Sequence, residues 1–156
     1  MQKITPFLWF DNDAEEAMDF YLSVFKDSKV VNVFRVGEGA PGPHGGIVVA
    51  TFVINGLEIM VLNGGPYFKL TPAFSLHVAC DTQAEIDELW DKLLADGQPS
   101  QCGWLTDKFG LSWQIVPTIL DRLIGDKDPA KSDRVREAML KMVKLDIAAL
   151  EKAHKG

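Results

Sequence analysis

The sequence predicts an α+β protein built from two similar β-α-β-β-β units followed by a C-terminal helix. Two observations indicate the repeat. The apolar helical stripe that begins at Ala17 recurs 69 residues later, from Ile86. The strand pattern that begins at Gly56 recurs 54 residues later, at Gly110. The two offsets differ by 15 residues, and this difference falls where the first unit carries the glycine- and proline-rich loop 37–46.

The first unit, residues 1–66, begins with an apolar strand from Ile4 to Phe10. The side chains of 11–13 can accept the free N–H groups of a helix start, and a helix of about 13 to 26 follows with its apolar residues along one stripe. The dipeptide Asn55-Gly56 predicts a tight hairpin between the last two strands. The remaining strands are expected at Val30–Val36, Ile47–Ile54 and Leu57–Leu62.

The second unit, residues 67–117, repeats this order. Asp81 and Thr82 precede a helix of about 83 to 96, which ends where Gly97 can take the left-handed conformation. The weakly patterned segment from Pro99 to Leu105 is expected to supply one strand. The outer strands of the unit are expected at Phe74–Cys80 and Leu111–Pro117.

Residues 118–156 lie outside the repeat. A short segment, Thr118 to Ile124, leads to a turn and then to one helix from about 132 to 153, with Ser132 and Asp133 at its start. The apolar stripe of this helix consists of Val135, Met139, Met142, Val143 and Leu150. This stripe requires apolar cover, either from the sheet of its own chain or from a second copy in a homodimer.

The composition excludes several classes of protein. A chain of 156 residues with a net charge of -6 lacks the basic surface that nucleic-acid binding requires. No stretch approaches the roughly 18 to 20 apolar residues of a membrane span, so we expect no membrane partner. Two cysteines, Cys80 and Cys102, are too few for a disulfide framework. We interpret both as free thiols in a reducing cytoplasm.

Four segments carry a resemblance to a known family. The residues 4–117 resemble the vicinal oxygen chelate superfamily, which includes glyoxalase I, bleomycin- and fosfomycin-resistance proteins and extradiol dioxygenases. Four segments carry a narrower resemblance: Ile4-Thr-Pro-Phe-Leu-Trp-Phe10, Ala14-Glu-Glu-Ala-Met-Asp-Phe-Tyr21, Cys102-Gly-Trp-Leu-Thr-Asp-Lys-Phe-Gly-Leu-Ser-Trp-Gln-Ile-Val-Pro117 and the tail between Ala138 and Leu150. In these segments the chain looks like the group called 3-demethylubiquinone-9 3-methyltransferase.

The resemblance implies that each unit curls its sheet into a half-barrel and that the paired half-barrels enclose one cavity. In the enzymes, four side chains on the inner face hold a divalent metal. The resemblance places the corresponding positions here at Pro6, Met60, Ser75 and Gln114. Proline and methionine cannot replace the nitrogen and oxygen donors that such metals need, and serine is a poor ligand. We therefore expect neither a metal nor another cofactor.

Residues two apart on a strand share a face, so the cavity wall can be predicted from these four positions. The predicted wall consists of Pro6, Leu8, Phe10, Glu58, Met60, Leu62, Ser75, His77, Ala79, Ser112, Gln114 and Val116. The predicted opposite face, under the helices, consists of Phe7, Trp9, Ile59, Val61, Leu76, Val78, Trp113 and Ile115. A mostly apolar wall with a few polar groups is typical of a small-molecule pocket.

Two titratable residues on this wall are the catalytic candidates. His77 could act as a general acid or base near neutral pH, and Glu58 could orient it or take a proton itself. The alternative is that His77 is held by structural hydrogen bonds and that Glu58 points from a strand end into water. Gln114 and Ser75 would orient the bound molecule.

The leading hypothesis is a dimeric protein that binds a small, partly apolar molecule, with or without catalysis. Methyl transfer, which the name of the resembled group describes, would require a site for S-adenosylmethionine. The glycine-rich segment 37–46 lies between two strands and opens no helix, so it does not match the phosphate- or cofactor-binding turns of doubly wound proteins. A metal-dependent lyase or isomerase remains the alternative if the four metal-ligand positions of the family correspond to other residues of this chain.

Overall fold

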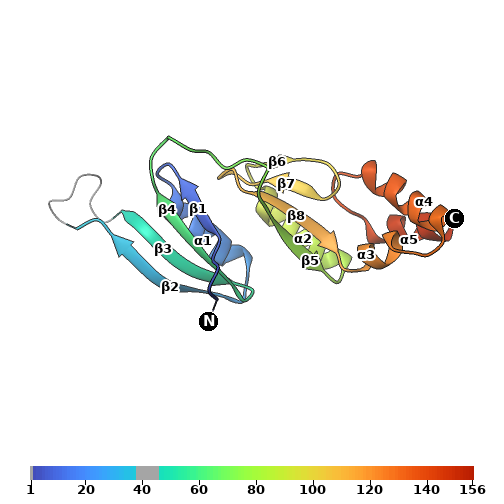
Figure 1. Ribbon diagram of the computed structural model, residues 1–156, viewed down its shortest axis with the longest axis horizontal. Helices are drawn as coiled ribbons and strands as arrows, with labels where there is room; N and C mark the ends of the chain where they lie inside the picture. The colour runs from blue at the N-terminus through green and yellow to red at the C-terminus, as the bar shows by residue number, and fades with distance from the viewer. Residues whose placement is uncertain (1, 38–45) are drawn as a thin grey trace. The chain divides into compact units, whose positions relative to one another are not determined.

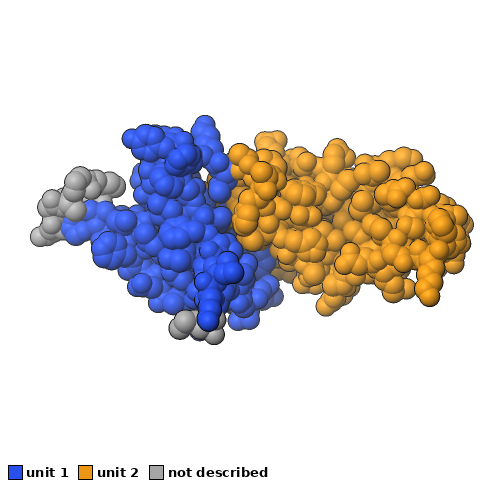
Figure 2. All heavy atoms as spheres, viewed as in Figure 1, with its two compact units in different colours: residues 1–70 blue, residues 71–156 orange. Residues whose placement is uncertain are grey.

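The computed structural model describes residues 2–37 and 46–156 (Figure 1). The chain divides into two compact units, residues 1–70 and 71–156 (Figure 2). Each unit has its own four-stranded sheet. Most of the glycine-rich loop 37–46 falls outside the described residues. Within the described residues, no helix combines the length and the apolar character needed to cross a membrane.

Unit 1 has the predicted β-α-β-β-β order. Its elements are β1 (Phe7–Phe10), α1 (Ala14–Val24), β2 (Ser28–Arg35), β3 (Ile47–Ile54) and β4 (Leu57–Asn63). They form a four-stranded sheet, sheet A, in the order β1-β4-β3-β2, in which β1 runs parallel to β4 and the other pairs are antiparallel. The predicted hairpin is confirmed, since Asn55 and Gly56 both have positive φ between β3 and β4.

Helix α1 covers one face of sheet A. The ring of Tyr21 stacks on Phe52 of β3 with the ring centroids 6.3 Å apart, and both side chains are fully buried. The strand register places Ile59 and Val61 of β4 on the same face as Phe52. This face is the core of unit 1, as the alternation along β4 predicts.

The prediction of which residues of the first strand face the helix and which face the open side of the sheet is wrong. Leu8 pairs with Val61, so Leu8 and Phe10 lie under α1, each with 3% of its surface exposed. Phe7 and Trp9 lie on the opposite face, and Phe7 is 49% exposed. Every residue of this strand is apolar, so no alternation of polar and apolar residues indicates which face of the strand is buried.

The start of α1 is held by a residue of β4. Asp13, the last of the predicted capping residues 11–13, occupies the cap position but makes no side-chain capping bond. Instead the side-chain oxygen of Asn63 accepts the N–H of Ala14 at 2.9 Å, and its amide nitrogen donates to the carbonyl of Ile47 at 3.0 Å. One side chain therefore ties the start of the helix to two strands.

Unit 2 repeats the order and adds helices. Its first elements are β5 (Ser75–Cys80), α2 (Gln83–Leu94), β6 (Gln98–Pro99), β7 (Trp104–Thr106) and β8 (Ser112–Pro117). They form sheet B in the order β5-β8-β7-β6, with β5 parallel to β8. The single strand predicted between Pro99 and Leu105 is in fact two short strands, β6 and β7, joined by a turn.

The predicted cap of α2 is confirmed. The hydroxyl of Thr82 accepts the N–H of Glu85 at 3.2 Å, and the carboxylate of Glu85 accepts the N–H of Asp81 at 2.9 Å. At the other end, Asp96 and not Gly97 takes the left-handed conformation, with φ of 59°. Gly97 is required for space, because a Cβ there would lie 2.2 Å from the carbonyl oxygen of Thr106.

The C-terminal extension contains three helices where the sequence predicted one from 132 to 153. They are α3 (Ile119–Ile124), α4 (Pro129–Leu140) and α5 (Ile147–Lys155). Asp128 accepts the N–H of Ala130 and starts α4 early, and Asp146 accepts the N–H of Ala149 and starts α5. The apolar stripe continues across the break, so periodicity alone did not reveal it.

The three helices enclose a second apolar cluster. Its buried members are Val116, Leu120, Leu123, Val135, Leu145 and Leu150. Val116 belongs to β8, so the extension packs on its own unit. Of the two alternatives for the apolar stripe, this is cover by the sheet of its own chain. Val143 of the predicted stripe is 42% exposed instead.

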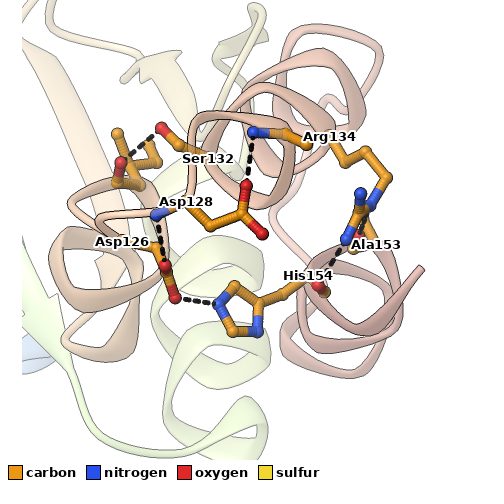
Figure 3. A network of polar contacts seen from close by, with 8 residues as sticks. Asp126, Asp128, Ser132, Arg134, Ala153 and His154 are labelled. Atoms are coloured by element: carbon orange, nitrogen blue, oxygen red, sulfur yellow. Dashed lines mark hydrogen bonds and ion pairs between the residues drawn. The ribbon is translucent and has the colours of Figure 1, made fainter.

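A polar network holds the end of α5 against the turn between α3 and α4 (Figure 3). The carboxylate of Asp126 accepts the N–H of Asp128 at 2.9 Å and lies 2.8 Å from Nε2 of His154. The guanidinium of Arg134 donates to the carbonyls of Ala153 and His154, both at 2.9 Å. These contacts join the end of α5 to the turn through one carboxylate and to α4 through one guanidinium.

This network makes the stability of unit 2 sensitive to acid. The N–H of Asp128 and the ring of His154 hold the pKa of Asp126 below its ordinary value of 3.8. Such a carboxylate stabilises the folded state above about pH 4, and the contribution is lost as the pH falls through the folded pKa. We expect Asp126→Asn to lower the thermal midpoint at about pH 6 and to lower it much less below about pH 3.

The control for this measurement is Asp133→Asn, which removes an exposed carboxylate paired only with Arg136 on the surface of α4. Thermal unfolding followed by circular dichroism at both pH values compares the two variants. An equal loss of stability at both pH values in Asp126→Asn would contradict the prediction.

The two cysteines are free thiols, as predicted, and they differ in burial. Burial, with a smaller contribution from Glu85 and Asp81, raises the pKa of the Cys80 thiol to about 12. Cys102 is half-buried in the turn between β6 and β7.

We expect iodoacetamide at about pH 8 to add one adduct, at Cys102, to the native protein and two adducts in denaturant, as counted by mass spectrometry. Modification of Cys80 at a comparable rate in the native protein would refute this expectation.

Candidate functional site

The open face of sheet B gathers four of the predicted site residues. The parallel pairing of β5 with β8 sets Ser75 opposite Ser112 and His77 opposite Gln114. The alternate residues Trp113 and Ile115 are buried on the other face, which α2 covers. The alternation predicted for these two strands is therefore the one observed.

Gln114 and Ser75 form a hydrogen-bonded pair on this face. The side-chain nitrogen of Gln114 donates to the hydroxyl of Ser75 at 2.9 Å. Within the described residues, the hydroxyl hydrogen of Ser75 and the second amide hydrogen of Gln114 stay available as donors, and the side-chain carbonyl oxygen of Gln114 stays available as an acceptor. Both side chains are half-buried, so a bound molecule would meet them with limited competition from water.

His77 is an exposed side chain of β5 beside this pair. Among the described residues, no hydrogen bond or ion pair holds its ring. The structure therefore gives no support to the alternative in which His77 is held by structural hydrogen bonds. Both ring nitrogens are available for a bound molecule or for proton transfer.

The third strand, β7, adds residues that the sequence analysis did not assign to the site. Trp104 pairs with Gln114, and Thr106 pairs with Ser112, so both lie on the open face. Trp104 is half-buried and offers an aromatic surface beside the polar pair. The signal in the sequence was the hairpin centred on Phe109-Gly110, which fixes the register of Trp104 against Gln114.

Ser112 is the buried member of this group, with 1% of its surface exposed. Its hydroxyl has no hydrogen-bond partner within the described part of the chain. An unpaired buried hydroxyl costs about 1–3 kcal/mol, so a partner from a bound molecule or from water would be favourable here.

Asp107 fixes the hairpin that leads into β8. One oxygen of its buried carboxylate accepts the N–H groups of Phe109 and Leu111 at 2.9 and 3.1 Å. The other oxygen accepts the indole N–H of Trp113 at 2.9 Å. Because Trp113 is adjacent to Gln114 in β8, this carboxylate sets the register that presents Gln114 on the open face.

The open face of sheet A is apolar by comparison. Phe7 pairs with Met60 in register, and Trp9 lies on the same face. The ring of Phe68 meets the ring of Trp9 edge to face with centroids 5.0 Å apart, and the indole N–H of Trp9 donates to the carbonyl of Gly65 at 2.9 Å. The segment that follows β4 therefore covers part of this face.

The remaining predicted residues of unit 1 have different places. The carbonyl of Pro6, just before β1, accepts the N–H of Met60 at 2.9 Å. Glu58 is half-buried, and the side chain of Gln2 bonds its backbone N–H and carbonyl at 3.2 and 2.8 Å. Leu8 and Phe10 are in the core and not on the open face. The hypothesis that Glu58 orients His77 joins residues of two units and stays a prediction.

The donor chemistry of the four family positions does not fit a divalent metal. Pro6 offers no side-chain donor and Met60 offers a thioether, and neither replaces an imidazole or a carboxylate. The amide of Gln114 is already bonded to Ser75. In the described ranges, no group of three or more histidine, cysteine, aspartate or glutamate side chains is placed to hold a metal ion.

Two β-α-β-β-β units, each with its first strand parallel to its last, define the fold of the vicinal oxygen chelate superfamily. The fosfomycin resistance protein FosX of Mesorhizobium loti has this fold, with a TM-score of 0.52 at 14% identity over 79% of this chain and 98% of its own. A crystal structure from Pseudomonas aeruginosa has a TM-score of 0.62 at 22% identity, over 75% of this chain and 98% of its own.

The chain belongs to the 3-demethylubiquinone-9 3-methyltransferase family, whose model matches residues 2–116. A PhnB protein from Bacillus cereus is 43% identical and has a TM-score of 0.70, with 75% of this chain and 100% of that chain covered. No curated protein matches the chain. The family match ends in β8, so the helices α3 to α5 and the tail 138–150 lie outside it.

The role of Asp107 can be tested by Asp107→Asn. The amide nitrogen of asparagine would face an N–H donor, so at least one hydrogen bond to a buried charge would be lost. We expect the free energy of unfolding of unit 2 to fall by about 2–4 kcal/mol. Urea unfolding followed by tryptophan fluorescence measures the loss, and amide exchange at Phe109 and Leu111 localises it.

The matched control is Asp91→Asn, which changes an exposed carboxylate on α2. We expect this control to stay within about 0.5 kcal/mol of the wild type. Slow exchange at Phe109 and Leu111 in the Asp107→Asn variant would show that the carboxylate does not hold the hairpin.

Proposed function

We propose that this protein binds a small, partly apolar molecule on the open face of sheet B. The observation that carries the proposal is the hydrogen-bonded pair of Gln114 and Ser75, half-buried beside the exposed ring of His77. A polar pair with free donors and a free acceptor suits a carbonyl or hydroxyl group of the ligand. Trp104 suits an aromatic or aliphatic part of the same molecule.

The rigidity of the backing supports binding on this face. Trp113 and Ile115 anchor β8 in the core, with 1% and 0% of their surfaces exposed. The polar side chains on the open face therefore stand on a strand that cannot shift without disturbing the core. Polar groups held in this way lose little conformational freedom when a ligand binds.

Binding is a better supported proposal than methyl transfer, although the family description names a methyltransferase. The glycine-rich segment 37–46 connects the antiparallel strands β2 and β3 and leads into no helix, so it lacks the context of a nucleotide- or cofactor-binding turn. The second candidate is proton-transfer catalysis by His77. The register that sets His77 opposite Gln114 favours it, because a ligand held by Gln114 would lie near the imidazole.

The pairing of two copies of the chain in a homodimer and a location in the cytoplasm belong to the same proposal. The two free thiols agree with a reducing compartment. The exposed apolar residues of β2, with Phe34 at 65% exposure, offer surface for association with a second copy. Sedimentation at micromolar concentration tests the dimer directly.

A ligand-observed NMR screen of neutral fragments, each with one aromatic ring and one carbonyl or hydroxyl group, tests the binding site. We expect fragments that bind the wild type to lose about tenfold or more in affinity with Gln114→Ala or Ser75→Ala. Asp91→Asn, which changes an exposed carboxylate of α2 on the other side of sheet B, serves as the control. Unchanged affinity in both site variants would refute the proposed site.

The variant His77→Ala separates binding from catalysis. If His77 is an acid or base, the variant keeps most of the fragment affinity and loses turnover of any fragment that the wild type converts. If affinity and turnover both stay at the wild-type level, the catalytic candidate is wrong, and the binding proposal stands on Gln114 and Ser75 alone.

A further inference from the structure

The turn between β6 and β7 has an unfavourable backbone conformation. The N–H of Trp104 bonds the carbonyl of Gln101 at 3.1 Å, and the two residues between them, Cys102 and Gly103, have φ of 58° and 84°. Two consecutive left-handed residues define a tight type I′ turn. Glycine adopts this conformation freely, but cysteine does so at an energetic cost, because its Cβ lies too close to the following carbonyl oxygen. Contacts outside the turn must therefore hold Cys102.

The C-terminal extension supplies these contacts. The N–H of Cys102 donates to the carbonyl of Met142 at 2.9 Å, and the N–H of Gly103 donates to the carbonyl of Val143 at 2.8 Å. Both N–H groups of the turn are thus paired with the segment between α4 and α5. We refer to this segment together with the first residue of α5, residues 141–147, as the strap.

Gly103 transmits this contact to sheet B. Its carbonyl accepts the N–H of Ile115 at 2.8 Å, next to Gln114 in β8. A Cβ at Gly103 would lie 2.8 Å from the carbonyl oxygen of Ile115 and 3.0 Å from the side chain of Leu145. The strap, the turn and β8 are therefore in direct contact at a position where no side chain fits.

Helix α2 anchors the other side of the strap. The side chain of Gln83 donates to the carbonyl of Leu145 at 3.1 Å and accepts the N–H of Ile147 at 2.8 Å. Lys144 pairs with Asp87 at 2.8 Å, and Leu145 is fully buried. The strap is held by α2 on one side and holds the turn on the other.

We propose that the strap sets the position of Trp104 on the open face of sheet B, so that docking of the C-terminal helices controls the binding site. Trp104 is the residue that directly follows Gly103, and it pairs with Gln114. A change in the position of Gly103 therefore acts directly on Trp104. The control of ligand binding rests on the proposed function of this face. The strap lies outside the residues 2–116 that the family model matches, so this proposed control of the binding site belongs to the C-terminal extension.

The test uses the full chain labelled with 5-fluorotryptophan and contains no ligand. Gln83→Ala removes both hydrogen bonds from α2 to the strap and changes no residue of the turn or the open face. We expect the fluorine resonance of Trp104, assigned with Trp104→Phe, to shift or broaden while that of Trp9 in unit 1 stays in place. We expect the amides of Cys102 and Gly103 to exchange about tenfold faster or more.

Lys92→Ala is the matched control, because this residue lies on the exposed side of α2 and pairs with Glu88, away from the strap. Lys144→Ala, which removes only the ion pair to Asp87, is expected to produce a smaller change of the same kind and replaces Gln83→Ala if that variant does not fold.

A purely structural strap would lower the thermal midpoint and leave the Trp104 resonance and the two exchange rates at wild-type values. That result would overturn the proposal. Because these readouts need no ligand, their failure is distinct from failure of the binding site, which the Gln114 and Ser75 variants report.

Discussion

The parallel pairing of the first and last strands is the constraint on which each unit depends. A helix must follow the first strand, so the chain returns to pair with it only at the end of the unit. In unit 2 this pairing sets Ser75 and His77 of β5 against Ser112 and Gln114 of β8, although Gln114 lies 39 residues after Ser75 in the sequence. The buried carboxylate of Asp107 then fixes the hairpin that delivers β8 in the correct register.

Unit 1 obeys the same constraint with different chemistry. Its parallel pair, β1 and β4, presents Phe7, Trp9 and Met60 on the open face, where unit 2 presents serine, histidine and glutamine. The capping bonds of α1 and α2 also differ, since Asn63 of β4 serves one helix and Thr82 serves the other. The repeat has therefore preserved topology and core packing, while the exposed face of each sheet has its own character.

The sequence predicted the topology because strong local signals mark it: the hairpin at Asn55-Gly56, the cap at Thr82 and the periodic stripe of each helix. It predicted the faces of β5 and β8 because the family resemblance placed Ser75 and Gln114 on one face, and residues two apart on a strand share a face. It did not predict the phase of β1, where all four residues are apolar. The break between α4 and α5 was also missed, since its apolar positions keep a helical spacing and the bonds that hold the strap come from Gln83 and the distant turn at Cys102.

The separation of the two faces of sheet B has a consequence for how such proteins diversify. Trp113 and Ile115 stabilise the fold, whereas Gln114 between them contributes little to the core and can change at small cost in stability. A lineage could thus exchange one set of ligands for another through substitutions at alternate residues of a single strand. Members of the family then share the fold. They share the chemistry of the open face only where those alternate residues are the same.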